Sequence, residues 1–281
     1  MRLARFRAED GAVRLGRVDG NDLIDLTEEF GASVRVLLPT LTERGPEILA
    51  ARGQRHALGD VTLLAPIDDP QKYLGIGMNY AAHAEEARQA GIPIPTSQMW
   101  FNKQVSCIND PFGEIVRPVV SEQLDYEIEL GVVIGRPARN VAAEDARAHI
   151  AGYLVVNDVS VRDWLAGLSP TFTLGKSFDT HGPIGPWLTT DDEIEDPLKL
   201  QLTLSVNGEV RQSADTSGMI YDIYEQIAYL SQVMTLQPGD ILATGTPSGI
   251  GAPTGTWLVP GDVVRAEISG LGAIENAVTE G

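Results

Sequence analysis

Leu124–Gly131, with the sequence LDYEIELG, is the stretch around which the rest of the chain is organised. In an extended strand, successive side chains point to opposite faces. The alternation separates an apolar face from an acidic one: Leu124, Tyr126, Ile128 and Leu130 against Asp125, Glu127 and Glu129. The branched run Val132–Ile134 follows, so the strand is expected to enter the core. Acids on such a strand repel one another and are costly to desolvate unless a cation neutralises them; the alternative is that they face water.

A second acidic position lies about thirty residues further on, at the end of another apolar strand. Gly152–Ser160 is aromatic and branched until it reaches Asn157 and Asp158. An acid in that position is better placed as a ligand than as a surface charge. Together with Glu127 and Glu129, Asp158 completes an all-oxygen set, with no Cys or His at metal-ligand spacing. Hard oxygen donors favour Mg²⁺, Mn²⁺ or Ca²⁺ over Zn²⁺ or Cu, so the sequence predicts a metal site.

Composition limits the partners and the compartment. The 281 residues carry a formal net charge of −18, which disfavours nucleic acid and anionic membranes as partners and leaves a small-molecule substrate. The single cysteine, Cys107, excludes an internal disulfide and suits a reducing compartment. The first residues lack the apolar core of a signal peptide, and no apolar run reaches the roughly 18 residues of a membrane span. A cytoplasmic protein is therefore expected.

The pattern divides the chain into two units. Residues 1–68 are expected to form a small N-terminal α+β domain that ends in a linker at Pro66–Pro70. Residues 69–281 are expected to be predominantly β with some α, an α+β class without a βαβ rhythm. In this larger unit the Asn207-Gly208 pair predicts a hairpin, and apolar residues at helical spacing predict a helix over Ile220–Met234.

Two further segments carry residues with possible chemistry. A helix is predicted over Ala81–Gly91, where His83 and Glu86 are three residues apart and share a face. Glu86 could orient the imidazole as a general base requires, although an ordinary surface pair has the same spacing. The loop Ser169–Pro186 is rich in Gly, Pro and hydroxyl side chains and contains Lys176, which is a solvated lysine unless the fold places it elsewhere.

Several segments, in order along the chain, resemble the fumarylacetoacetate hydrolase family: GIGMNYAAHAEE, LDYEIELGVVIG, GYLVVNDVSVRD, TLGKSFDTHGPIGP, LSVNGEVRQ and LSQVMTLQPGDILATGTPSGIG. The resemblance covers about residues 72–278. It implies a catalytic domain with a mixed β-roll or distorted barrel and a few helices, and a homodimer. It also implies a Mg²⁺- or Mn²⁺-dependent enzyme that acts on 1,3-dicarbonyl or 2-oxo acid substrates and usually cleaves a C–C bond.

The resemblance also implies roles for individual residues. Glu127, Glu129 and Asp158 would hold the metal, and His83 with Glu86 would activate water. Lys176 would stabilise the enolate, and Thr180 would lie near the metal. Contacts with the substrate's carboxylate or carbonyl oxygens are implied for four residues: Tyr80, Lys103, Arg162 and Thr246.

Two positions depart from the family pattern, and two other functions compete with hydrolysis. Leu165 stands where many members have glutamine, and Gln104 stands where proline is common, so a more apolar substrate is expected. Decarboxylation of a 2-oxo diacid such as oxaloacetate, or tautomerisation of an enol acid, could use the same metal site. A non-catalytic binding protein on this scaffold is the third possibility.

Overall fold

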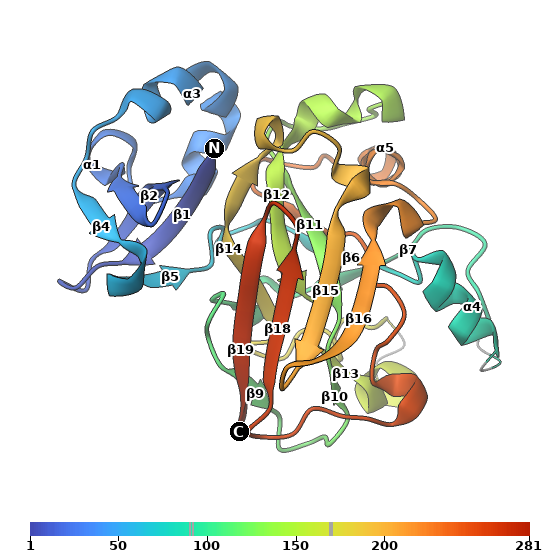
Figure 1. Cartoon of the computed structure of the whole chain (residues 1–281). Helices are drawn as coiled ribbons and strands as arrows, with labels where there is room; N and C mark the ends of the chain where they lie inside the picture. The colour runs from blue at the N-terminus through green and yellow to red at the C-terminus, as the bar shows by residue number, and fades with distance from the viewer. Residues whose placement is uncertain (90, 92, 169–170) are drawn as a thin grey trace.

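A computed structural model describes residues 1–89, 91, 93–168 and 171–281 (Figure 1). The strands, in chain order, are β1 (Arg2–Arg7), β2 (Val13–Asp19), β3 (Asp22–Asp25), β4 (Arg55–Ala57), β5 (Thr62–Leu64), β6 (Tyr73–Gly77), β7 (Met99–Lys103), β8 (Ile108–Asn109), β9 (Ile115–Arg117), β10 (Leu124–Asp125), β11 (Ile128–Ile134), β12 (Ile150–Asn157), β13 (Ser160–Val161), β14 (Gly182–Thr190), β15 (Gln201–Val206), β16 (Glu209–Asp215), β17 (Ile241–Ala243), β18 (Val263–Ile268) and β19 (Gly272–Glu280). The α-helices are α1 (Thr27–Phe30), α2 (Val34–Leu37), α3 (Leu41–Ala50), α4 (Ala81–Gln89) and α5 (Ile223–Val233). Over the described ranges, none of the helices combines the length and apolar character that a membrane crossing requires.

Two large sheets organise the fold. Within the described residues, a 12-stranded sheet has the main order β4-β3-β2-β1-β14-β12-β11-β17-β6-β7, and a 5-stranded sheet has the order β16-β15-β18-β19-β9. The smaller sheet packs in front of the strands β11, β12 and β14 (Figure 1). The predicted class, mostly β with some α, is confirmed. Each sheet begins and ends on an edge strand, so the expected barrel is an open roll of two packed layers.

The core explains why β11 is buried on both faces. Alternate residues Ile128, Leu130, Val132 and Ile134 belong to the apolar cluster between the two sheets. Val133 belongs to a second cluster, which the N-terminal helices cover. Leu124 and Tyr126 join the first cluster as the alternation predicted. Because both faces are covered, the reading in which the acids of this stretch face water is wrong.

The predicted strand over residues 124–134 is interrupted. The ladder breaks at Tyr126 and Glu127, between β10 and β11. The physical reason is that two backbone N–H groups bind side chains here. The N–H of Glu127 donates to Asn157 Oδ1 at 3.0 Å, and that of Ile128 donates to Gln212 Oε1 at 3.0 Å. The break lets Glu127 leave the regular pleat without leaving a backbone group unpaired.

Other boundaries also differ from the prediction. The predicted helix that ends at Gly91 is present as α4 up to Gln89, and Ala90 lies outside the described residues. Of the predicted loop Ser169–Pro186, residues 169–170 are likewise not described, and residues 182–186 form the start of β14. This part is a strand because it pairs with β12 on one side and with β8 on the other. Tertiary pairing overrides the local Gly and Pro signal.

The N-terminal strands extend the large sheet. β1 pairs antiparallel with β14, with Leu3 opposite Leu188, and β2 and β3 follow outward. Figure 1 shows this N-terminal part beside β14, with α3 above its strands. Arg5 forms an ion pair with Asp68 at 2.6 Å, which ties β1 to the predicted linker.

Candidate metal centre

The three predicted metal ligands converge at one end of the β11–β12 pair. Ile128 of β11 pairs with Asn157 of β12. Glu127 and Glu129 are the neighbours of Ile128 in the chain, and Asp158 directly follows Asn157. Oxygen atoms of the three carboxylates lie within 4.8 Å of one another. Glu127 is 5% exposed, Glu129 1% and Asp158 0%. Buried carboxylates this close need positive charge between or beside them.

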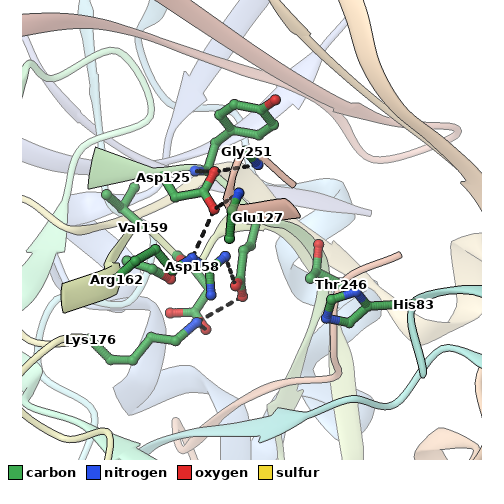
Figure 2. Close-up of polar contacts among 12 residues, drawn as sticks. His83, Asp125, Glu127, Asp158, Val159, Arg162, Lys176, Thr246 and Gly251 are labelled. Carbon is green, nitrogen blue, oxygen red and sulfur yellow. Dashed lines mark hydrogen bonds and ion pairs between the residues drawn. The ribbon is translucent and has the colours of Figure 1, made fainter. Parts of the chain in front are cut away.

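Basic side chains supply part of that charge (Figure 2). Lys176 Nζ donates to Glu127 Oε2 at 2.7 Å and to Asp158 Oδ2 at 2.6 Å. Arg162 donates through Nη2 to Glu127 Oε1 at 2.5 Å. Lys103 Nζ donates to Asp158 Oδ1 at 2.7 Å. Lys176 is therefore not a solvated loop lysine but an internal partner of two of the acids.

The charges do not balance. Within the described residues, the cluster has four buried carboxylates, including Asp125, against the three cations Lys103, Arg162 and Lys176. Burial opposes ionisation of Glu127, yet Lys176 and Arg162 lower its pKa to about 2. For Glu129, burial and the neighbouring carboxylates of Asp158 and Glu127 raise the pKa well above its usual value. Within the described residues, the carboxylate of Glu129 accepts a hydrogen bond from the N–H of Gly245, at 2.7 Å.

A small cavity opens beside these carboxylates. Its volume is about 100 Å³, and its polar lining consists of His83, Glu127, Glu129, Arg162, Lys176 and Thr246. The predicted contact between His83 and Glu86 is present, with Nδ1 and Oε2 3.3 Å apart. A proton on Nδ1 directed at Glu86 leaves Nε2 of His83 as a proton acceptor. In the view of Figure 2, His83 and Thr246 lie on the opposite side of Glu127 from Arg162 and Lys176.

Comparison with known proteins shows the family of the chain. The model of the fumarylacetoacetate hydrolase C-terminal family matches residues 72–279, and that of the Rv2993c-like N-terminal family matches residues 1–66. The chain belongs to the fumarylacetoacetate hydrolase family. A mitochondrial oxaloacetate tautomerase of Bos taurus is 40% identical, with 99% of this chain and 91% of that protein covered.

Solved structures of the fumarylacetoacetate hydrolase family are also similar over the full length. The maleylpyruvate hydrolase of Sphingobium sp. SYK-6, solved with manganese(II) and pyruvate, is 35% identical with a TM-score of 0.85, and both chains are covered completely. The fumarylacetoacetate hydrolase of Exiguobacterium antarcticum is 35% identical with a TM-score of 0.87, again with complete coverage of both chains. The chain therefore shares the whole fold with enzymes of this family.

Lys103 has a different position from the one that the family resemblance implied. Its side chain is fully buried and does not line the cavity. Besides Asp158, its ammonium donates to the carbonyl oxygens of Lys176 at 2.6 Å and His181 at 2.9 Å. Three acceptors use the three hydrogens of an ammonium group, so none remains for a substrate. We therefore correct the expected substrate contact: Lys103 holds Asp158 and the loop that carries Lys176.

Tyr80 and Thr180 also lie outside the cavity lining. Tyr80 is 2% exposed, and burial, followed by the charge of Glu129, raises the pKa of its phenol. Its expected contact with substrate is not present in the cavity as described. Thr180 accepts the N–H of Val116 at 2.9 Å through its hydroxyl, which therefore supports β9 instead of the metal cluster. Neither position follows from the family motif alone.

Thr246 lines the cavity, but its hydroxyl already has a hydrogen-bond donor and an acceptor within the protein, so it differs from the expected substrate contact. Gln212 accepts the N–H of Ile128 and donates to the carbonyl of Pro247, which fixes the orientation of its amide. The second amide hydrogen donates to Thr246 Oγ1 at 2.9 Å. The hydroxyl of Thr246 in turn donates to the carbonyl of Ile128 at 2.9 Å. Its only hydrogen is used, so Thr246 cannot also donate to a substrate carboxylate or carbonyl.

Sequence reasoning missed the supporting role of Asp125, which it placed with the other two acids. Asp125 Oδ1 accepts the N–H of Gly251 at 2.7 Å, and Oδ2 accepts Arg162 Nε at 2.8 Å. Asp125 is fully buried, and it fixes Arg162 so that the other edge of the guanidinium meets Glu127. The missed residues Asp125, Asn157 and Gln212 all bind backbone or cation groups of the cluster. Only Asn157, directly before Asp158, had a local signal.

Proposed function

We propose that this chain is a Mg²⁺- or Mn²⁺-dependent hydrolase that cleaves a C–C bond in a 1,3-dicarbonyl or acylpyruvate-type small molecule. The observation that carries the proposal is the unbalanced carboxylate of Glu129, which lies next to two other acids and a cavity lined by His83. A divalent cation would compensate the excess charge, and three carboxylates are the donor set that Mg²⁺ and Mn²⁺ prefer.

The residues that would hold the cation are Glu127, Glu129 and Asp158. When bound, the ion supplies Lewis-acid polarisation of substrate oxygens. Lys103 and Lys176 keep Asp158 in place, and Arg162 keeps Glu127 in place. This support is what a site needs to hold its ligands in a fixed geometry.

The chain's own residues account for the proton transfers of hydrolysis. His83 Nε2 removes a proton from water, and Glu86 stabilises the imidazolium that results. The hydroxide adds to the substrate carbonyl, and the C–C bond breaks with its electron pair moving into an enolate. The Lys176 ammonium, at the cavity wall, stabilises the developing negative charge. His83 then returns the proton to the enolate carbon, which balances the reaction.

A second candidate is tautomerisation of a 2-oxo acid. The oxaloacetate tautomerase that is 40% identical favours it. This reaction needs proton transfer between carbon and oxygen but no attacking water, and His83 could perform it. Product analysis separates the two candidates. Hydrolysis of an acylpyruvate releases pyruvate and a carboxylic acid, whereas a tautomerase changes the keto–enol ratio and releases no fragments.

The proposal is tested by metal binding and turnover of two variants. We expect Lys176→Ala to lower kcat by about a hundred- to a thousandfold, because one stabiliser of the developing charge is lost. Glu127→Gln should lower both Mn²⁺ affinity, measured by calorimetry, and turnover, by more than Lys176→Ala does. Glu122→Gln, at an exposed acid, is the matched control. A Glu127→Gln variant with normal metal affinity and normal turnover would contradict the proposal.

A further inference from the structure

The part of the cavity lining that is not polar is made of large apolar side chains. They come from β6, β7, the short π-helix Trp164–Leu168 and loop segments: Ile76, Met78, Met99, Phe101, Leu165 and Phe172. The rings of Phe101 and Phe172 pack edge to face, with centroids 6.1 Å apart. Because these residues come from several elements, no single amphipathic strand or helix explains why they share this wall.

Two glycines make room for this apolar wall. A Cβ on Gly75 would lie 2.5 Å from Cζ of Phe101, and a Cβ on Gly175 would lie 2.5 Å from Cδ2 of Leu165. Any larger residue at either position would displace the aromatic ring or the leucine. Leu165 therefore contributes an apolar side chain to the wall, and Gly175 leaves the space that it occupies.

The backbone also holds two wall residues in an uncommon conformation. Met78 has φ 54° and Phe172 has φ 64°, in the left-handed region that bulky side chains rarely occupy. Such a conformation is energetically unfavourable and persists where the surrounding structure imposes it, often at ligand sites. Both residues line the cavity.

The cations that line the cavity are paired with buried acids. Of the lining residues in the described ranges, the cations Arg162 and Lys176 both form ion pairs with buried acids. The residues outside those ranges, Ala90, Ile92, Ser169 and Pro170, are uncharged by sequence. A carboxylate at the far end of a ligand would therefore meet the apolar wall, whose side chains offer no cation to pair with.

We propose that the cavity selects a 2-oxo or 1,3-dicarbonyl monocarboxylate with an apolar far end over the dicarboxylate of equal length. This inference rests on the proposed metal-dependent function, because the metal would take the oxo-acid head of the substrate. It extends that function by naming the substrate class. A volume of about 100 Å³ limits the tail to a few heavy atoms in the arrangement described.

A matched pair of inert ligands tests the selection without relying on turnover. 2-Oxopentanoate and 2-oxoglutarate have the same number of carbons and the same head, and they differ in a terminal methyl against a terminal carboxylate. Calorimetry on the Mn²⁺-loaded protein should show 2-oxopentanoate binding at least about tenfold more tightly, the size of a small apolar discrimination. Pyruvate, which has only the head and a methyl group, serves as the common reference.

Variants at Leu165 connect the selection to the wall. Leu165→Gln should reduce the ratio between the two ligands to less than about threefold, because the amide can donate to the terminal carboxylate. Leu165→Met, which keeps the wall apolar, should retain the wild-type ratio. Pyruvate binding by both variants shows that they are folded and that the head site forms, and the selection is read from the ratio of the other two ligands.

The outcomes separate this inference from the function on which it rests. If pyruvate binds but 2-oxoglutarate binds as tightly as 2-oxopentanoate, or more tightly, the selection is overturned and the metal-dependent function stands. If neither pyruvate nor 2-oxopentanoate binds in the presence of Mn²⁺, both the function and the selection are overturned. An unchanged ratio in Leu165→Gln also overturns the role given to the apolar wall.

Discussion

Glu129 is the carboxylate whose charge the described cluster leaves unbalanced. Glu129→Gln keeps the shape, and the amide oxygen can still accept the N–H of Gly245. We expect the metal-free variant to be more stable than wild type by about 1 kcal/mol or more, because the cost of burying an ionisable carboxyl next to two other acids is removed. Mn²⁺ affinity should fall at least about tenfold, as one ligand charge is lost. Urea unfolding with EDTA and Mn²⁺ calorimetry measure the two effects.

The control for this pair of effects is Glu122→Gln, which removes one exposed acid and should change neither quantity. The informative feature is the opposite sign of the two changes. A less stable metal-free variant that binds Mn²⁺ normally would mean that Glu129 is a structural acid and that the charge count does not describe the site.

Gln212 is a positioning residue for the metal strand. Gln212→Met removes the acceptor of the Ile128 N–H and the donor to Thr246, and all of these groups are buried. We expect a loss of about 1–3 kcal/mol in the free energy of unfolding, since a buried backbone donor is left unpaired. Mn²⁺ affinity should fall as well, because Ile128 lies between Glu127 and Glu129. Gln232→Met, on the exposed side of α5, should be neutral. Wild-type stability together with wild-type affinity would show that the network has no positioning role.

These residues also show what could be predicted from sequence at this scale. The clustering of Glu127, Glu129 and Asp158 could be predicted because two of these acids alternate with apolar residues along one strand and the third ends a second apolar strand. The contact between His83 and Glu86 follows from helical spacing. Gln212 reaches Ile128 across 84 residues, and no local pattern marks that contact. The family resemblance assigned Lys103 to substrate, and its sequence position does not reveal the acceptors that surround its ammonium group.

Among the elements, β6 and β17 bring the two halves of the cavity together. They run parallel, with Ile241 opposite Tyr73, and each leads into cavity residues: β6 to Met78 and β17 to Thr246. The predicted strand over Ile241–Pro247 is shorter than expected, since β17 ends at Ala243. It ends there because the N–H of Gly245 binds the carboxylate of Glu129 and no neighbouring strand. The presence of β17 could be predicted from the sequence, whereas the residue at which it ends depends on the contact with Glu129.

Asp240 fixes these two strands side by side. It is fully buried, and it accepts the N–H of Lys72 at 2.9 Å, Lys72 Nζ at 2.7 Å and the N–H of Gln237 at 2.7 Å. Asp240→Ala should lower the free energy of unfolding by about 2–4 kcal/mol, because three donors lose a charged acceptor. Asp60→Ala, at an exposed acid, should stay within about 0.5 kcal/mol of wild type. Equal stability of the two variants in urea would contradict the role of Asp240.

At the scale of the whole molecule, the order of the strands in the sheets could not be predicted from local sequence patterns. The sequence indicated two units. It did not indicate that β1 would pair in one sheet with β14, which is separated from it by about two-thirds of the chain. Non-local pairing of this kind is set by the packing of apolar faces. From the sequence alone, many strand partners and registers would bury these faces equally well. The homodimer, the division at residue 68, the small-molecule partner and the cytoplasmic location stay predictions.

His181 connects the two sheets and makes the stability of the whole fold depend on pH. It directly precedes β14, and its Nε2 lies 2.9 Å from the carbonyl of Val116 in β9. Burial lowers the pKa of His181 from 6.5 to about 4. Between these values the unfolded chain binds a proton that the folded chain does not, so stability is present above pH 6.5 and is lost as the pH falls toward 4.

Urea unfolding at pH about 7.5 and about 5 should show this loss, with His181 contributing about 2 kcal/mol. His181→Gln keeps a donor for Val116 and cannot titrate, so its loss over the same interval should be smaller by that amount. Equal losses in wild type and variant would mean that His181 does not control the acid sensitivity of the fold.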